Sequence, residues 1–277
     1  MENKLIILPF DHRSSFLKDI LNKPQKSRAR EMKKMIFEAF LSVIKNKKDF
    51  AVLVDEELGS DILINAKKLG IKICLPVEKS GQKELKLEFG NNFKGHIDKF
   101  SPDYVKILIR YNPHNTDINK RQLKVLKRLS QLDYKIILEL LVPPTPQESL
   151  LPNYDKKIRY INTMKAIEEI NEAINVNIWK LEGFNKKQWE GIIKKTNKGS
   201  KIIFLGRGED KKKVSNWMES ASHFKEIIGF AIGRTIFLEP LKDYENKKIS
   251  QEEAIEKIKL NFEYFVNLWN TKKNTNR

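Results

Sequence analysis

The feature that most constrains the fold is an alternation, along the whole chain, of short apolar runs with longer amphipathic runs. The short runs have the length of buried strands, and the longer runs have helical periodicity. Repeated strand–helix units favour a parallel sheet with right-handed crossovers, and eight units in about 250 residues is the number that closes a (β/α)8 barrel. A doubly wound open sheet is the alternative, but no run carries the glycine-rich fingerprint of a dinucleotide site.

The sequence therefore predicts the α/β class and a single (β/α)8 TIM barrel over residues 1–270, followed by a flexible tail over residues 271–277. The expected strands are residues 5–8, 50–54, 71–77, 104–109, 135–141, 176–181, 201–205 and 227–232. The expected helices are residues 28–45, 61–69, 91–100, 119–132, 158–174, 187–196, 210–222 and 251–269.

Composition indicates the compartment. The chain has 277 residues, of which 40% are apolar, and one cysteine, Cys74. A single cysteine excludes a disulfide within the chain and favours a reducing cytoplasm. The first apolar run is too short for a signal peptide, and no segment approaches the roughly 20 apolar residues of a membrane span. We expect a soluble cytoplasmic protein with no membrane partner.

The net charge of +17 has two interpretations. It could mark a nucleic-acid-binding protein. The lysines, however, occur as pairs scattered over the polar stretches, and no basic segment is interleaved with aromatic residues for base stacking. We interpret them as solvated helix faces and predict no nucleic-acid partner, while the positive field would attract a phosphorylated small molecule.

Every predicted strand delivers ionisable side chains at or near its carboxyl end, which is the catalytic face of such a barrel. In chain order these include Asp11, His12, Arg13, Asp55, Glu56, Glu57, Glu78, Lys79, Lys106, Arg110, Glu139, Lys180, Glu182, Arg207, Glu209 and Arg234. Among them we expect Arg13, Glu56, Glu78, Arg110 and Glu182 to contact a substrate. The pattern indicates an anionic, polyhydroxylated ligand.

Lys180 stands in the middle of a run that reads as a buried strand, where desolvation penalises an ammonium. One interpretation is a lysine whose stem is buried and whose head reaches water. The other is an amine with a lowered pKa, which is the usual nucleophile for forming a Schiff base with a ketone. Glu139 is isolated in its own apolar run and should pair with Lys180 or Lys106. Mutual repulsion should then lower the pKa of at least one lysine.

The seventh and eighth predicted strands end in GRG and GR. Glycines there free backbone N–H groups to approach an anion, a following helix adds its dipole, and arginine supplies a bidentate grip. The loops after these strands commonly hold phosphate in barrels. The predicted phosphate site consists of Gly206, Arg207, Gly208, Gly233 and Arg234.

Seven segments in order resemble class I, Schiff-base aldolases of the tagatose-bisphosphate aldolase family, and are most similar to the aldolase-like domain fused to 5-dehydro-2-deoxygluconokinase. They are LPFDHR (8–13), VDEELG (54–59), LPVEKSG (75–81), DYVKILIRYNP (103–113), ILELLVPP (137–144), IWKLEG (178–183) and GFAIGRTIF (229–237). The resemblance implies that Lys180 forms the Schiff base, that Glu139 is the acid/base carboxylate, and that Lys106 and Asp11 contact the substrate. It also implies that Gly206, Arg207, Gly233 and Arg234 hold the phosphate. Two departures are the GRGED loop, which lacks a serine, and His12 after Asp11.

The resulting hypothesis is a class I aldolase that cleaves a phosphorylated keto-sugar or keto-sugar acid and needs neither a cofactor nor a metal. Candidate substrates are 2-deoxy-5-keto-gluconate 6-phosphate and a ketose (bis)phosphate. The first alternative is a metal-assisted phosphosugar isomerase or aldolase, although the histidines (His12, His96, His114 and His223) are dispersed. The second is a barrel that binds a sugar phosphate without catalysis. A homo-oligomer is compatible with all three.

Overall fold

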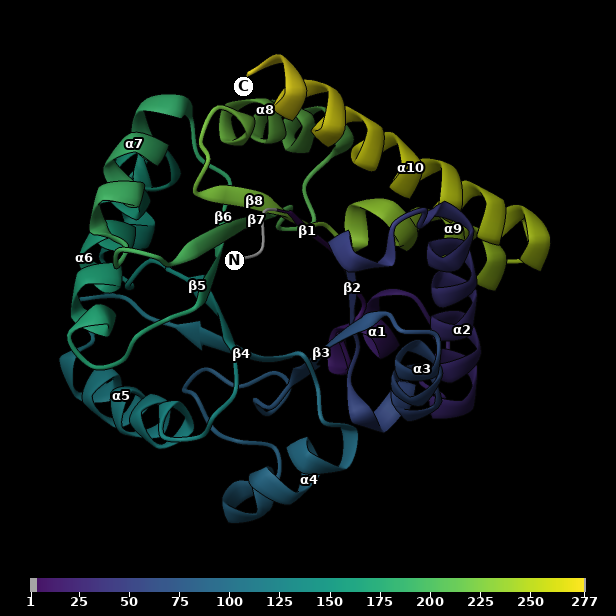
Figure 1. The fold of residues 1–277 in the computed structure, drawn as a ribbon, viewed down its shortest axis with the longest axis horizontal. Coiled ribbons are helices and arrows are strands. Elements are labelled where there is room, and N and C mark those ends of the chain that lie inside the picture. The colour runs from purple at the N-terminus through teal and green to yellow at the C-terminus, as the bar shows by residue number, and fades with distance from the viewer. Residues whose placement is uncertain (1–3, 277) are drawn as a thin grey trace.

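The computed structural model describes residues 4–276, and within them eight parallel strands pair in chain order into a closed barrel (Figure 1). The strands are β1 (Leu5–Pro9), β2 (Phe50–Leu53), β3 (Lys72–Pro76), β4 (Tyr104–Arg110), β5 (Ile136–Leu141), β6 (Ile178–Glu182), β7 (Lys201–Leu205) and β8 (Ile227–Ala231). The predicted single (β/α)8 barrel is confirmed, and all eight predicted strands overlap observed ones.

Helices surround the barrel on the outside (Figure 1). They are α1 (Ser14–Asp19), α2 (Lys26–Val43), α3 (Glu56–Lys68), α4 (Phe93–Phe100), α5 (Thr116–Ser130), α6 (Arg159–Asn171), α7 (Lys186–Lys195), α8 (Lys211–Ser222), α9 (Arg234–Glu245) and α10 (Gln251–Thr275). Short turns of 3-10 helix are η1 (Lys47–Asp49), η2 (Gly90–Asn92) and η3 (Glu148–Leu150), and η4 (Tyr154–Ile158) is a π-helix. None of the helices in this described part is long and apolar enough to cross a membrane.

Two features differ from the sequence-based expectation. Helices α1 and α9 were not predicted; α1 follows the charged loop after β1, and α9 begins at Arg234, separated from β8 only by Ile232 and Gly233. The tail expected to be flexible from residue 271 is helical as far as Thr275, because α10 continues along its neighbours and Trp269 is buried within it. Figure 1 shows this last helix lying across α8, α9 and α2.

The strands separate an inner core from an outer one. Alternate side chains point to opposite faces of a strand. The apolar residues that form the inner cluster come from all eight strands: Leu5, Ile7, Ala51, Leu53, Cys74, Tyr104, Ile137, Ile178, Ile203, Ile228 and Ala231. The opposite faces, with residues such as Leu8, Trp179 and Phe204, pack against the helices in the larger cluster.

The same alternation carries the inner apolar layer into a charged one. Lys106 lies two residues after Tyr104, Glu139 two after Ile137, and Lys180 two after Ile178, so all three side chains continue the inner face toward the carboxyl ends. The barrel interior is therefore apolar at depth and ionic at the top, where the eight strand-end loops begin.

The barrel closes where β1 pairs with β8, with Leu5 opposite Gly229. A Cβ atom at position 229 would lie 1.7 Å from the carbonyl oxygen of Leu5, so only glycine fits this seam.

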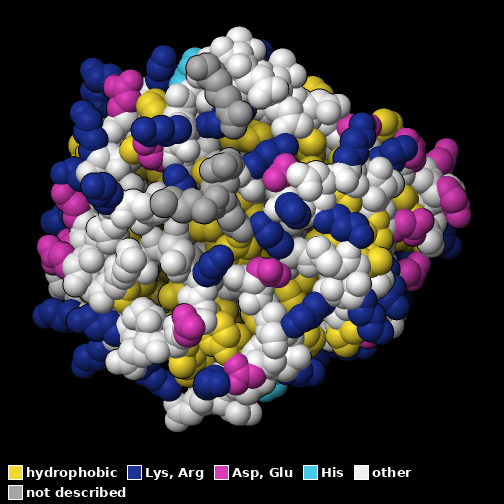
Figure 2. All heavy atoms as spheres, in the orientation of Figure 1, with side chains coloured by type: hydrophobic (Ala, Val, Ile, Leu, Met, Phe, Trp, Pro, Cys, Tyr) yellow, Lys and Arg dark blue, Asp and Glu magenta, His cyan; other side chains and the backbone are white. Residues whose placement is uncertain are grey.

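The lysines and arginines are spread over the face seen in Figure 2 with aspartates and glutamates among them.

Candidate active site

The centre of the site is Glu139, which lies between two lysines from the neighbouring strands. In the sheet register Glu139 of β5 is opposite Lys180 of β6, and its Oε2 atom is 2.9 Å from the Nζ atom of Lys180. The same oxygen is 2.9 Å from the Nζ atom of Lys106 on β4. All three residues are buried, and Lys180 is only 4% exposed. The prediction that Glu139 pairs with Lys180 or Lys106 is confirmed, and the structure shows both contacts.

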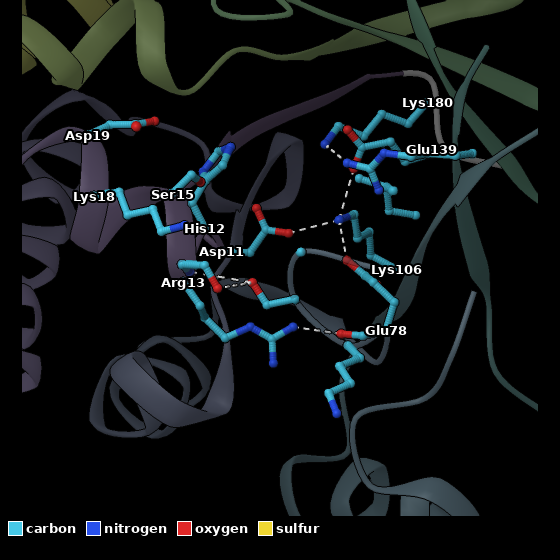
Figure 3. Close-up of a pocket in the computed structure, with 16 residues that line it drawn as sticks. Asp11, His12, Arg13, Ser15, Lys18, Asp19, Glu78, Lys106, Glu139 and Lys180 are labelled. Carbon is cyan, nitrogen blue, oxygen red and sulfur yellow. Dashed lines mark hydrogen bonds and ion pairs between the residues drawn. The ribbon is translucent and has the colours of Figure 1, made fainter. Parts of the chain in front are cut away.

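Lys106 also forms ion pairs with two further carboxylates. Its Nζ atom is 2.9 Å from Oδ2 of Asp11, which follows β1, and 2.6 Å from Oε1 of Glu78, which follows β3 (Figure 3). One ammonium thus joins carboxylates from three strand ends. Lys180 has a different environment, because Glu139 is the carboxylate that its ammonium contacts. The two lysines are therefore electrostatically distinct although they share one partner.

These contacts change the pKa values of the central groups. Burial alone would lower the pKa of Lys106, but Asp11, Glu139 and Glu78 outweigh it and hold that pKa well above the ordinary value. Burial would raise the pKa of Glu139, but the two ammonium groups lower it to about 2. The pKa of Asp11 is also lowered, against burial, by Lys106. Glu139 and Asp11 are thus carboxylates at neutral pH. Lys106 is therefore not the lysine whose pKa repulsion was expected to lower.

The charged centre opens into a pocket of about 340 Å³. Its walls come from the ends of β1, β3, β4, β5 and β6 and from α1. The lining residues are Asp11, His12, Arg13, Ser14, Ser15, Lys18, Asp19, Glu78, Lys79, Ser80, Gly81, Lys106, Leu108, Arg110, Glu139 and Lys180. Of the residues predicted to be catalytic or to bind substrate, Lys180, Glu139, Lys106, Asp11, Arg13, Glu78 and Arg110 are brought together here.

Arg13 and Arg110 line the pocket, but their guanidinium groups are largely engaged in holding its walls. Arg13 donates to Oε2 of Glu88 at 2.7 Å and to the backbone carbonyl of Glu78 at 2.6 Å, which ties the loop after β1 to the loop after β3. Arg110 donates to the carbonyl of Gln82 in the same loop at 2.9 Å. We therefore assign both arginines a positioning role in addition to their place at the pocket.

His12, which the sequence places at the catalytic face without an assigned role, lines the pocket, and helix α1 adds residues that were not predicted. Burial lowers the pKa of His12 from 6.5 to about 4, with Arg234 and Lys180 adding to the shift, so the ring is neutral at pH 7. Its Nδ1 atom is buried and has no hydrogen-bond partner within residues 4–276. Ser15 and Lys18 come from α1, a short helix that its amphipathic pattern does not distinguish from a loop. The signal that could have found them is proximity to Asp11 in the sequence.

Glu182 shares the face of β6 with Lys180 but does not line the pocket. Its carboxylate is 3.3 Å from Arg159 of α6 and 3.0 Å from Arg207 after β7. Arg207 also contacts Asp155 at 3.0 Å. Burial raises the pKa of Glu182 despite these cations. Glu182, predicted to contact substrate, is instead enclosed by side chains from a helix and a loop.

The predicted phosphate residues also lie outside the pocket. Arg207 is engaged with Glu182 and Asp155, and Arg234 donates to the backbone carbonyl of Arg207 at 3.3 Å. Gly208, at φ +76°, lies directly against the Arg234 guanidinium. Gly206 and Gly233 are packed beside Ile232 and the Pro9 carbonyl.

The charged residues after β2 are likewise used elsewhere. Glu56 bonds to His96 at 2.9 Å and to Lys99 at 3.0 Å, both on α4, so it faces away from the pocket. Asp55 forms a buried ion pair with Lys33 of α2 and accepts the N–H of Leu58 at the start of α3. Within the described part of the chain, no three histidine, cysteine, aspartate or glutamate side chains are arranged to hold a metal ion.

This geometry defines a (β/α)8-barrel protein with a buried lysine–carboxylate cluster at the carboxyl ends of its strands. The family described as "Uncharacterized protein conserved in bacteria (DUF2090)" matches residues 1–273, and the chain belongs to this family. No curated protein matches the sequence closely enough to count as a relative.

Solved structures share the fold at low sequence identity. A fructose-bisphosphate aldolase from Plasmodium falciparum has a TM-score of 0.71 and 13% identity over 97% of this chain and 91% of its own. A Schiff base forming fructose-1,6-bisphosphate aldolase has a TM-score of 0.61 and 12% identity over 95% of this chain and 94% of its own. Cgl0159 from Corynebacterium glutamicum has a TM-score of 0.61 and 14% identity over 95% of this chain and 86% of its own.

Proposed function

We propose that this protein is a lyase of the class I aldolase type, which cleaves a C–C bond through a Schiff base on Lys180. One observation carries the proposal. A buried lysine lies 2.9 Å from a buried, ionised carboxylate, and both line a pocket at the carboxyl end of the barrel. Two of the solved structures of similar fold are fructose-bisphosphate aldolases, one of which is described as forming a Schiff base.

Lys180 is a better nucleophile than Lys106. A lysine must lose a proton before it attacks a carbonyl carbon. Lys106 is held as an ammonium by three carboxylates, which raise its pKa well above the ordinary value. Lys180 contacts one carboxylate, Glu139. Lys106 therefore has an electrostatic role, and Lys180 forms the adduct.

Glu139 is placed to move protons during adduct formation. Attack of the neutral Lys180 amine on the substrate carbonyl gives a carbinolamine, and loss of water from it gives the iminium. While the nitrogen is neutral, Glu139 has lost one of the two cations that lower its pKa, so its affinity for a proton rises. It can then take a proton from the nitrogen and return it to the leaving hydroxyl. Asp11, whose pKa is also lowered, lines the pocket beside Lys106 and acts as the base for the substrate hydroxyl whose C–O–H becomes the new aldehyde.

The pocket favours a small anionic substrate, for which we propose a phosphorylated keto-sugar or keto-sugar acid. A volume of about 340 Å³ suits such a molecule. Lys18 and Lys79 are exposed at the rim and are free to face the anionic end. Candidates are a ketose 1,6-bisphosphate and 2-deoxy-5-keto-gluconate 6-phosphate.

Borohydride trapping tests the proposal. The wild-type chain is incubated with fructose 1,6-bisphosphate, tagatose 1,6-bisphosphate, 2-deoxy-5-keto-gluconate 6-phosphate or dihydroxyacetone phosphate, reduced, and weighed intact. We expect one adduct per chain on the peptide that contains Lys180. Lys106→Met should retain part of the trapping, and Lys187→Met, which alters an exposed lysine of α7 outside the pocket, is the matched control. An adduct on Lys106 would exchange the two roles. Binding of these phosphates without any adduct would indicate a binding barrel, and activity lost on exhaustive chelation would indicate metal-assisted chemistry.

A further inference from the structure

Glu78 is one of three carboxyl groups that contact Lys106, and it differs from the other two, Asp11 and Glu139. One of its oxygens contacts Lys106 at 2.6 Å, whereas the other, Oε2, is buried and has no hydrogen-bond partner within residues 4–276. The side chain lines the pocket, and its backbone carbonyl is fixed by Arg13 at 2.6 Å. A buried carboxyl oxygen without a partner is costly as part of a carboxylate, and the cost falls when the group carries a proton.

The surroundings of Glu78 support this difference. Burial raises the pKa of Glu78, and the Asp11 carboxylate after β1, which shares Lys106 with it, raises it further, while Lys106 opposes both. Lys106 is shared with Asp11 and Glu139, so its charge is divided among three carboxyl groups. Asp11 and Glu139 have lowered pKa values and remain carboxylates at neutral pH.

Aldol cleavage needs an acid as well as bases. When the C–C bond breaks, its electron pair moves into the iminium and leaves an enamine on the lysine, and a proton must reach the enamine carbon before water can release the ketone. The side chains that supply protons in enzymes are histidine, carboxylic acids, lysine, tyrosine and cysteine. No tyrosine or cysteine is among the described residues that line the pocket. His12 is neutral, Lys106 is held as a cation, and Lys18 and Lys79 lie at the exposed rim.

We propose that Glu78 is the catalytic acid of this pocket, which gives its proton to the substrate carbon that loses its C–C bond. This inference rests on the Schiff-base function proposed above. In the cleavage direction the proton passes from the Glu78 carboxylic acid to the enamine carbon, the enamine becomes an iminium, and Glu78 becomes a carboxylate. Hydrolysis of the iminium releases the ketone and free Lys180, and Glu78 regains a proton from water. In the reverse direction the Glu78 carboxylate removes that proton.

Hydrogen exchange isolates this step. Dihydroxyacetone phosphate forms the same enamine from its iminium, so in D2O the wild-type chain should incorporate deuterium at the carbon next to the carbonyl, measured by mass spectrometry of the ketone. Glu78→Gln keeps the shape and hydrogen-bonding capacity of the side chain but has no acidic proton. We expect it to lower the exchange rate by a factor on the order of 10² to 10⁴ and to leave borohydride trapping on Lys180 in place. Glu78→Asp, which retains a carboxylic acid, should restore part of the exchange.

Glu84→Gln is the matched control, because Glu84 lies in the same loop outside the pocket and pairs with Arg121. Exchange in Glu78→Gln at the wild-type rate would overturn the inference, since another group must then move the proton. Loss of trapping in Glu78→Gln would also overturn it, since Glu78 would then act on adduct formation. If the wild-type chain itself gives no adduct, it is the Schiff-base function that fails.

Discussion

Lys180 and Glu182 are two residues apart on β6 and point to the same face, yet they belong to different electrostatic systems. The first, which we call the pocket cluster, consists of Asp11, Glu78, Lys106, Glu139 and Lys180. The second, which we call the closed cluster, consists of Asp155, Arg159, Glu182 and Arg207. The pocket cluster is built from strand ends alone, whereas the closed cluster takes partners from η4, α6 and the loop after β7.

Comparing the two clusters shows which charged side chains at the strand ends a substrate can contact. In the pocket cluster one side faces a cavity, and Oε2 of Glu78 has no hydrogen-bond partner among the described residues. The Nε atom of Arg159 in the closed cluster also lacks a hydrogen bond there, but it lies 3.2 Å from Oδ1 of Asp155. In the closed cluster both oxygens of Glu182 contact arginines, and Arg159 also stacks on Phe184 at 4.5 Å. A substrate could reach these arginines only by replacing contacts already made. We therefore interpret the closed cluster as a structural ion-pair network that holds the loops after β6 and β7 in place.

The largest expected effect is on the nucleophile. Lys180→Ala should abolish the borohydride adduct and lower kcat/KM by at least about 10³-fold, because no other group forms the covalent intermediate. Glu182→Gln changes a residue of the same strand that belongs to the closed cluster, and this variant should retain the adduct. The measurements are intact mass after reduction and steady-state rates. An adduct that survives in Lys180→Ala would contradict the division between the two clusters.

The second effect is on stability. Lys106→Met leaves three buried carboxyl groups around an apolar side chain, and we expect a loss of about 3–5 kcal/mol in the free energy of unfolding, measured by urea denaturation at pH 7. Arg207→Met should cost less, because Arg207 is partly exposed and Glu182 keeps Arg159. Equal losses would mean that the two clusters are held together in the same way.

The third effect locates the anionic end of the substrate. Lys79→Ala at the pocket rim should raise KM for a phosphorylated substrate about ten- to hundredfold, as expected for a lost charged hydrogen bond of ~1.5–3 kcal/mol, and should change KM for an unphosphorylated analogue far less. Arg234→Ala should change both KM values little. The reverse result would restore the loops after β7 and β8, with Arg207 and Arg234, as the phosphate site.

The smallest effect is a pH dependence specific to His12. Its pKa is about 4 in the folded chain and near 6.5 when unperturbed, so between these values the unfolded chain binds more protons. The stability that neutral His12 contributes is complete above pH 6.5 and is lost as the pH falls toward 4. His12→Asn should remove a slope worth on the order of 1–3 kcal/mol across this window, measured by denaturation at several pH values. Asp11 and Glu139 have lowered carboxyl pKa values and act at lower pH, so an unchanged slope would show that the pKa of His12 is not lowered in the folded chain.

Sequence patterns predicted the strand order and the pairing of Glu139 with Lys180, because strand periodicity decides which residues face inward and neighbouring strands bring them together. The same patterns could not separate Lys180 from Glu182. That separation depends on Arg159 of α6, which contacts Glu182 and stacks on Phe184, a tertiary arrangement that strand periodicity does not reveal. The short helices α1 and α9 were missed for a similar reason, since α1 buries Phe16 against α2 and α9 packs against α10, and such tertiary contacts are not visible in local periodicity.

The pairing of β1 with β8 has a consequence for how the site forms while the chain folds during synthesis. Asp11 lies at the end of the first strand, and the second edge of that strand is filled only when Gly229 arrives opposite Leu5. Until then a nascent chain exposes the unpaired edges of β1 and of the growing sheet, which makes it open to wrong strand pairing. A side chain at position 229 would clash with Leu5 and leave the edge of β1 unpaired. Such a chain would be expected to accumulate as aggregate during synthesis rather than as an inactive folded protein.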